Sequence, residues 1–153
     1  MATAGAAPDH AFLAVPPAPG RAYHPDGVEF SYGHTRAETL RLRDVYAAAG
    51  YGQGHRVALL LENRPEFFFH YLALNALGCG IVPINPDYRH DEMRYQMDHS
   101  EADLLVAVGS RVADLEAVAR ESARPLPVVS ADAMPAALPA PGAGPRPGEP
   151  GRR

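Results

Sequence analysis

Lysine and tryptophan are both absent from the 153 residues of this chain, so all 14 of its basic residues are arginine. The absence of lysine excludes every mechanism that needs one: the lysine of a phosphate-binding loop, a Schiff base and a lysine general base. A single cysteine excludes an internal disulfide framework and a cysteine-based zinc site. The net charge of −4 and the pI of about 5.9 disfavour nucleic acid as a partner.

Long hydrophobic runs are missing as well. The N-terminal segment has no basic region, and its longest apolar run, residues 11–15, is too short for the core of a signal peptide. No stretch approaches the length of a membrane span. We therefore expect a soluble, cytoplasmic protein.

Composition divides the chain into three parts. Residues 1–27 contain five prolines and little periodic pattern, and we expect an extended arm. Residues 28–130 carry all the strong periodicity and form the expected domain. Residues 131–153 are nearly all Ala, Pro, Gly and Arg, with just two large apolar side chains, Met134 and Leu138. Such a composition buries too little surface to offset the entropy of ordering, so this tail is predicted to be disordered.

Strand and helix patterns alternate through the middle part. Strands are expected at residues 28–32, 57–61, 81–84, 104–108 and 126–129, with helices at 35–49, 63–77, 90–99 and 112–119. The uninterrupted apolar run at 57–61 is typical of a strand buried on both faces. Pro83 places its strand near an edge. The alternation predicts an α/β fold with a parallel sheet, right-handed crossovers and helices on its faces.

Two helix starts carry recognisable signals. Thr35 and Glu38 have the spacing of a capping box. Asn63 is expected to cap the helix that has Pro65 in its first turn. Aromatic and leucine side chains at residues 67–77 cover nearly the whole circumference of that helix, so we expect it to be buried on all sides.

Glycine-rich turns are the first candidates for a functional site, because ligands of open parallel sheets bind beyond the carboxyl ends of the strands. The turns at residues 50–54 and 78–80 follow helices rather than strands, so a structural role is favoured. Gly109 and Ser110 follow a strand and begin a helix, and their amides offer a place for an anion. An ordinary turn with a helix cap is the favoured interpretation of this pair.

Histidine and acidic residues that lie close in sequence suggest a metal site. They are His90, Asp91, Glu92, Asp98 and His99. The two histidines are nine positions apart, and no HExxH or comparable spacing occurs. We favour a solvated helix face on which Arg94 and Asp98 form an ion pair.

His70 and Cys79 are the remaining candidates for chemistry. His70 lies beside Asn75 on the expected buried helix, and we interpret it as a hydrogen-bonded core histidine rather than a catalytic base. No GxSxG elbow and no plausible serine or cysteine triad occur. Cys79 lies in a helix-to-strand turn and is interpreted as a small packing residue.

Four short blocks follow one another in the middle part. They are FSY (30–32), GHRVA (54–58), ENRPE (62–66) and LGCGIVPINP (77–86). In order and spacing they resemble the N-terminal part of the AMP-forming acyl-CoA synthetase and adenylation-domain superfamily, with His55 in place of the usual Asp. The resemblance covers about residues 28–130. It is specific for the superfamily and much less specific for the substrate.

The resemblance implies a partial N-terminal subdomain of the adenylate-forming fold. Complete enzymes of that family are several times longer. They bind ATP with a Ser/Thr/Gly-rich loop ending in lysine, and they use a YGxTE block, a ribose-binding Asp and a second lysine. None of these matches a position here, so we assign no catalytic, cofactor-binding or metal-binding residue. ATP, Mg²⁺ and CoA are implied for the complete enzyme, and no cofactor is assigned to this chain.

Two hypotheses of function follow. The first is a truncated part of an ATP-dependent, AMP-forming ligase of a fatty or other hydrophobic acid, inactive alone. It would expose an apolar face to the remainder of the ligase or to a full-length relative, and it would self-associate when isolated. The second is a non-catalytic α/β binding or interaction module derived from that family, with that face polar or covered. A flavodoxin-like nucleotide-binding protein is less favoured, because no strand is followed by a phosphate loop.

Overall fold

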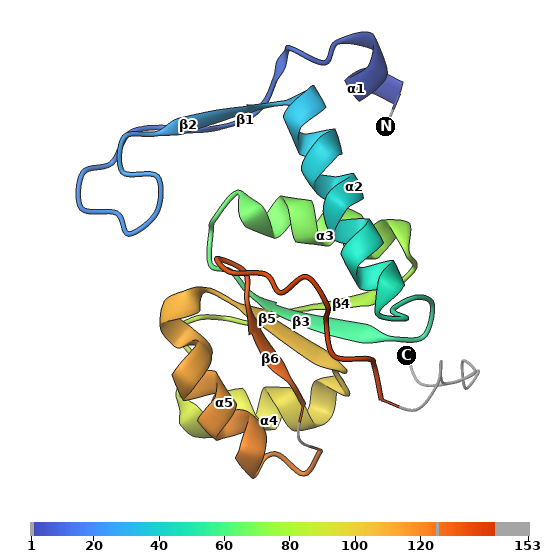
Figure 1. Cartoon of the computed structure of the whole chain (residues 1–153). Helices are drawn as coiled ribbons and strands as arrows, with labels where there is room; N and C mark the ends of the chain where they lie inside the picture. Colours follow the sequence, from blue (N-terminus) through green and yellow to red (C-terminus); the bar gives the residue numbers. More distant parts are fainter. Residues whose placement is uncertain (1, 125, 143–153) are drawn as a thin grey trace.

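The computed structural model describes residues 2–124 and 126–142 (Figure 1). Its centre is a parallel sheet in the order β4-β3-β5-β6. The strands are β3 (Arg56–Leu60), β4 (Gly80–Pro83), β5 (Leu104–Ala107) and β6 (Val128–Ser130). Four of the five predicted strands thus lie in this sheet, and β4 with its Pro83 is an outer strand of it, as expected.

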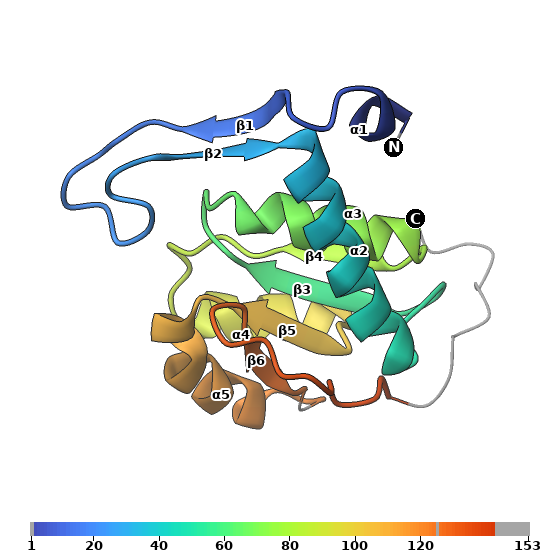
Figure 2. The same cartoon turned by 45° about the horizontal axis from the view of Figure 1, so that its top comes forward.

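Helices lie on both sides of the sheet, with α2 and α3 on one side and α4 and α5 on the other (Figures 1 and 2). Their bounds are α2 (Tyr32–Ala48), α3 (Glu66–Ala76), α4 (His90–Ser100) and α5 (Val112–Glu121), the last preceded by the 3-10 turn η1 (Gly109–Arg111). The predicted α/β class is confirmed. None of the helices in residues 2–124 and 126–142 has the length and hydropathy of a membrane span.

The sheet is held together by strands that are apolar on both faces. Val57 pairs with Ile81 on one side and Leu104 on the other. All four residues of β5, and Val57 to Leu60 of β3, are no more than 1% exposed. Burying one such side chain stabilises the fold by about 1.5–3 kcal/mol. The neighbours β3 and β5 are separated in the chain by β4, so their carboxyl ends form the switch point of the sheet.

The strand expected at residues 28–32 does not join the parallel sheet, and this expectation is corrected. It forms β2 (Val28–Ser31), which pairs antiparallel with β1 (Ala11–Val15). The two strands make a separate ribbon that projects from the body (Figure 1). The expected arm at residues 1–27 therefore contains a short helix, α1 (Ala2–Ala6), and a paired strand. No residue of β1 is buried, so its sequence lacks the alternation that reveals a half-buried strand.

The predicted capping box of α2 is wrong. The helix begins at Tyr32, and the Ser31 hydroxyl caps it by accepting a bond from the His34 amide at 3.1 Å. Thr35 lies one turn inside the helix, where its buried hydroxyl has no hydrogen-bond partner among the described residues. Glu38 pairs with Arg41 instead. The extended backbone of Ser31 at the end of β2 sets the start of the helix.

The expected cap and the expected burial of α3 are also corrected. Pro65 rather than Asn63 stands at the cap position, and no side chain of the described residues caps the helix there. Phe69, which packs edge-on against Phe30, is buried, but Phe68 and Tyr71 are 44% and 42% exposed. The helix is covered by α2 and the sheet on one side only (Figure 2). Its other side presents aromatic rings to solvent.

Residues 131–142, which we call the strap, differ from the disordered tail that composition predicts. Leu138 is 8% exposed and belongs to the hydrophobic core, and Met134 packs against that core. The Tyr51 hydroxyl donates to the Pro139 carbonyl at 2.9 Å. The strap returns across the molecule beside the C-terminal end of α2 (Figure 1). The rest of the predicted tail, residues 143–153, lies outside the described residues.

The parallel sheet, and not the ribbon, is expected to dominate stability. Leu105→Ala should lower the free energy of unfolding by about 2–5 kcal/mol, because it leaves a cavity between two helical layers. Phe12→Ala, in the exposed ribbon, should cost about 1 kcal/mol or less, the value of its edge-on contact with Tyr32. Urea unfolding of both variants measures the difference. Equal losses would show that the ribbon belongs to the same core.

Candidate functional site

The carboxyl ends of the parallel strands meet at one edge of the sheet, where open α/β folds bind their ligands. A cleft of about 730 Å³ opens at this edge, beside β3 and β4. Its lining is mostly apolar or aromatic, with Leu59, Leu61, Phe67, Phe68, Pro83, Ile84, Pro86 and Tyr88, and the polar members are Glu62, Asn63, Arg64, Asn85 and Asp87. Ligand pockets have volumes of about 300–1,000 Å³ and linings of this kind. We therefore treat this cleft as the candidate site.

Arg64 is the basic residue of the cleft, and it lies in the loop between β3 and α3. Its side chain is only 13% exposed. The guanidinium donates to Asp132 at 3.3 Å, lies 3.7 Å from Glu62, and stands over the ring of Tyr23 at 5.1 Å. Planar stacking and fork-like hydrogen bonding suit arginine and not lysine. Arg64 thus joins three segments that lie far apart in the sequence.

Asp132 connects Arg64 to the turn that follows β5. One carboxylate oxygen binds Arg64, and the other accepts the Gly109 amide at 2.6 Å. A Cβ atom at position 109 would lie 2.8 Å from that oxygen, so glycine permits the close approach. The turn at Gly109 and Ser110 is therefore capped by the Asp132 side chain. The expectation that this turn supplies its own helix cap is corrected, because no described side chain of the turn forms a capping hydrogen bond.

The loop between β1 and β2 reaches the same place from the other side. The Tyr23 hydroxyl donates to the Asn63 carbonyl at 3.3 Å, and His24 Nε2 lies 2.9 Å from Glu66 Oε1. These contacts fix the segment between β3 and α3, whose residues form one wall of the cleft. The arrangement suits binding. Within the described residues, the groups with clearly shifted pKa values are Tyr46, Tyr51, His70, Cys79 and Glu121, and all of them lie outside this lining.

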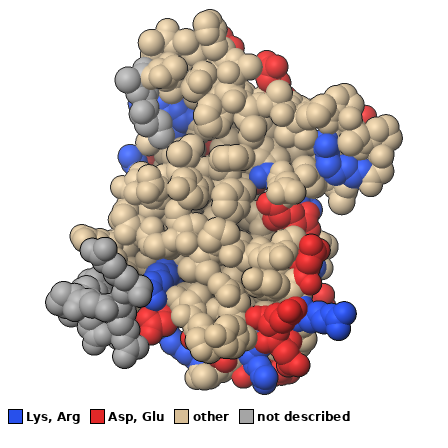
Figure 3. Space-filling model, turned by 180° about the vertical axis from the view of Figure 1, so that it is seen from behind, with Lys and Arg blue, Asp and Glu red and all other residues tan. Residues whose placement is uncertain are grey.

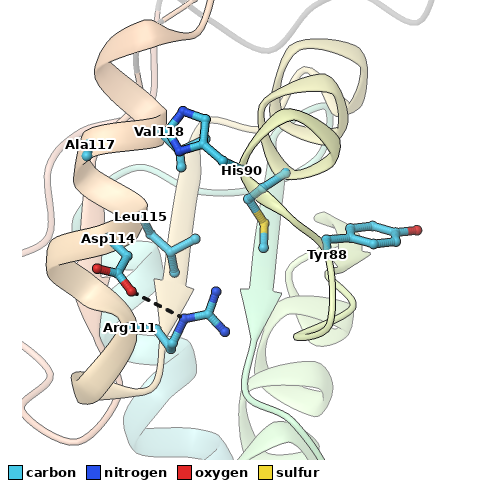
Figure 4. Close-up of a pocket in the computed structure, with 8 residues that line it drawn as sticks. Tyr88, His90, Arg111, Asp114, Leu115, Ala117 and Val118 are labelled. Carbon is cyan, nitrogen blue, oxygen red and sulfur yellow. Dashed lines mark ion pairs between the residues drawn. The ribbon is translucent and has the colours of Figure 1, made fainter.

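A second, smaller pocket of about 280 Å³ lies between α4 and α5 (Figure 4). Arg111 and Asp114 face each other in it at 3.9 Å, and Arg111 also donates to the Pro86 carbonyl at 3.1 Å. His90, at its rim, lies 2.7 Å from Glu121. The hydrogen bond from His90 lowers the pKa of the Glu121 carboxyl. The side chains of Arg111, Asp114 and His90 already have partners in the protein, which favours a packing groove between helices.

The five residues that suggested a metal site point to separate partners. Asp98 accepts the Ala123 amide at 2.8 Å, and the His99 ring lies 3.0 Å from the Tyr95 carbonyl. The expected pair of Arg94 with Asp98 is wrong, because Arg94 lies 3.5 Å from Asp91. In the part of the chain that the structure describes, no three His, Cys, Asp or Glu side chains are placed to hold a metal ion.

His70 is confirmed as a hydrogen-bonded core residue. It is 3% exposed, and its Nδ1 lies 2.8 Å from the Tyr46 hydroxyl. Burial, and then the nearby Arg41, lower the pKa of His70 to about 4. Burial raises the pKa of Tyr46, so the hydrogen bond joins a protonated phenol and a neutral imidazole.

Cys79 is confirmed as a packing residue, since it is 7% exposed and burial raises the pKa of its thiol to about 11. Such a thiol is a poor nucleophile at neutral pH. The neighbouring turn at residues 50–54 is structural, with Gly50 and Gly54 at φ +95° and +91°. His55 Nδ1 accepts the Gly52 amide at 3.1 Å within this turn. His55 thus supplies a hydrogen-bond acceptor at the position where the AMP-forming family usually has Asp.

Arg64, Asp132 and Tyr23 were not singled out by the sequence analysis. Arg64 stands within a family-like block, but nothing in its spacing indicates a partner. Asp132 lies in the segment predicted to be disordered, and Tyr23 lies in the expected arm. Arg64 and Asp132 share one signal, because both lie in loops that follow parallel strands, β3 and β6, and such loops form the ligand-binding edge of the sheet. Tyr23 lies in the loop of the ribbon and carries no such signal.

The chain was compared with known families and proteins. The profile of a family described as "AMP-binding enzyme" matches residues 3–150. A crotonobetaine/carnitine–CoA ligase of Proteus mirabilis (strain HI4320) is 36% identical over 78 residues, which make up 51% of this chain and 15% of that ligase. The expected resemblance to AMP-forming ligases is confirmed.

Solved structures show the same relationship. A fatty acyl CoA synthetase of Mycobacterium tuberculosis has a TM-score of 0.71 at 25% identity, over 86% of this chain and 25% of that one. The N-terminal domain of FACL13 from the same organism has a TM-score of 0.67 at 26% identity, over 86% of this chain and 32% of that one. The described fold is thus that of adenylate-forming N-terminal domains, and the chain spans less than a third of each relative.

Arg64 is expected to stabilise the candidate site through its stacking on Tyr23 and its bond to Asp132. Arg64→Ala should lower the free energy of unfolding by about 1–2 kcal/mol. Arg64→Lys keeps the charge but not the planar group, so its free energy of unfolding should lie between those of Arg64→Ala and the wild type. Arg43→Ala breaks an exposed pair with Asp44 and is the matched control, expected within about 0.5 kcal/mol of wild type. Urea unfolding compares the three variants. A loss in Arg64→Ala no larger than in the control would contradict the role.

The buried His70 makes stability depend on pH. Its folded pKa of about 4 lies below the unfolded value of 6.5, so the unfolded state binds a proton first as the pH falls. This contribution to stability is complete above pH 6.5 and is lost between pH 6.5 and 4, by roughly 3 kcal/mol. His70→Asn keeps a side chain that can hydrogen-bond to the Tyr46 hydroxyl, and it cannot titrate. The free energy of unfolding of this variant in urea should therefore fall less steeply between pH 6.5 and 4 than that of the wild type. Equal pH dependence of the two proteins would show that His70 does not cause the loss of stability.

Proposed function

Because the chain belongs to the family of AMP-binding enzymes, we propose that it is the N-terminal part of an ATP-dependent, AMP-forming acyl-CoA ligase. The complete enzyme would join a carboxylic acid to CoA through an acyl-adenylate, with release of AMP and pyrophosphate. The observation that carries this proposal is the family match over residues 3–150. The fold shared with a fatty acyl CoA synthetase supports it.

The chain alone is proposed to be inactive. It contains no lysine, and the lysines that the resemblance implies for ATP binding and adenylation have no counterpart in its sequence. The described cleft offers Arg64 and asparagine side chains for binding, but Arg64 is already bonded to Asp132. ATP, Mg²⁺ and CoA would therefore bind to parts of the complete enzyme outside this chain. A cytoplasmic location belongs to the same proposal, since ATP and CoA are supplied there.

The acid is proposed to be a fatty or other hydrophobic carboxylic acid. A relative named as a fatty acyl CoA synthetase supports this class, and a relative named as a crotonobetaine/carnitine–CoA ligase makes small, polar acids the contrasting class. The aromatic residues of α3 do not distinguish the two, because Phe69 is core and Phe68 faces solvent.

The remainder of the ligase, or a full-length relative, is the proposed partner. Exposed rings of α3, Phe68 and Tyr71, adjoin the apolar walls of the cleft. Seen from behind, the upper and middle surface is largely uncharged, and charged side chains gather toward the bottom, where α4 and α5 lie (Figure 3). Surfaces of this kind favour association with another protein surface, including self-association of the isolated chain.

A non-catalytic binding or interaction module is the second candidate. The strap favours it, because Leu138 of this chain itself fills the hydrophobic core. A domain that closes its own core in this way has the covered face expected of an adapted module.

Enzyme assays and gene sequence test the proposal. The purified chain, given ATP, Mg²⁺, CoA and saturated fatty acids or carnitine, should release no pyrophosphate or AMP above the blank. Turnover by the chain alone would contradict its proposed inactivity. The DNA beyond the Arg153 codon should encode, in one of three frames, a Ser/Thr/Gly-rich loop with its lysine.

The joined polypeptide should then release pyrophosphate with at least one fatty acid and more slowly with carnitine. The same polypeptide with alanine in place of the loop lysine is the control. A faster reaction with carnitine would overturn the proposal that the substrate is a hydrophobic acid. The absence of the loop in every frame would favour the non-catalytic binding module.

A further inference from the structure

The strap is fixed at two places and is free of regular structure between them. At its start, the Ala131 amide donates to Ala107, and Asp132 binds Gly109 and Arg64. Further on, Leu138 is buried, and the Pro139 carbonyl accepts the Tyr51 hydroxyl. Side chains between and beyond these anchors, at 133, 136, 137 and 140, are exposed.

This geometry makes the strap a weakly held cover over a strongly apolar face. Three of its twelve residues are proline, which has no amide hydrogen, so it cannot form a continuous ladder with a neighbouring strand. Leu138 is its only buried large side chain, whereas β5, beneath the same core, is buried throughout. Segments with few buried contacts open locally at a lower free energy than the whole domain.

We propose that the face beside Tyr51 is a docking site for an extended, proline-containing segment with a leucine anchor, and that the strap is its intramolecular occupant. In the closed state the strap blocks the site. In the open state Leu138 leaves the core, and a second segment of the same chemistry binds in its place. A tethered occupant has a high effective concentration, so competition from outside requires the strap to be weakened. The proposal concerns the described domain and holds whether or not the chain belongs to a ligase.

The closed strap is also connected to the candidate site. Asp132 is shared between the strap and Arg64, which lines the cleft. Loss of the Asp132 charge should therefore loosen the strap at its first anchor without touching its second. Two variants, Asp132→Asn and Leu138→Asp, open the same element from opposite ends. Ala137→Asp, an exposed neighbour of Leu138, adds the same charge and is the matched control.

Hydrogen exchange on the full chain tests the local opening. In the wild type, the strap amide of Ala131, which donates to Ala107, should exchange at least about tenfold faster than the amide of Leu105, since the strap opens without global unfolding. Asp132→Asn should speed strap exchange a further severalfold and leave β5 unchanged, while Ala137→Asp matches the wild type. Equal exchange rates in the strap and in β5, or acceleration of both by Asp132→Asn, would show that the strap opens only with the whole fold and would overturn the proposal.

Binding of a synthetic peptide of residues 131–142 tests the docking site. Fluorescence anisotropy of the labelled peptide should show binding to Leu138→Asp at least about tenfold tighter than to the wild type or to Ala137→Asp. A peptide with Asp in place of Leu138 should not bind. Where Leu138→Asp does not fold, Asp132→Asn takes its place, with a smaller gain of affinity expected. Equal binding of the peptide to all chains, or to none, would overturn the docking site.

Discussion

Side-by-side pairing of β3 and β5 is the constraint on which the other features of this molecule depend. Both strands are apolar on both faces, so they are stable only when helices or other segments cover them on either side. The helices α2 and α3 cover one side and α4 and α5 the other (Figure 1). The same pairing brings the ends of β3 and β5 together, and that is where Arg64 meets the Gly109 turn through Asp132.

The candidate site is thus a consequence of how the sheet is covered. Its cleft lies where the strands end and where α3 leaves its aromatic outer side unburied. The loop of the ribbon and the strap approach this edge from opposite ends of the chain, and both contact Arg64. A family scaffold, an apolar cleft and the first anchor of the strap therefore share one sheet edge.

Sequence reasoning succeeded where a local pattern and the tertiary outcome agree. The buried runs of the parallel strands, the glycines at the helix exits and the core role of His70 all follow from short-range signals. It failed where a neighbour overrides the signal. Thr35 has the spacing of a cap, yet the end of β2 moves the helix start to Tyr32. Asp98 has helical spacing to Arg94, yet the amide of Ala123 holds its carboxylate.

The sequence by itself determined the α/β class, the alternation of its elements and the likeness to AMP-forming ligases, because each rests on periodicity or on blocks of adjacent residues. Only the tertiary structure decided that residues 28–31 pair with β1, that Asp132 bridges Arg64 and Gly109, and that Leu138 enters the core. These contacts join segments that are tens of residues apart. A composition poor in apolar side chains predicts disorder on average, but one well-placed leucine and two hydrogen-bonded anchors are enough to order the strap against a face that is already formed.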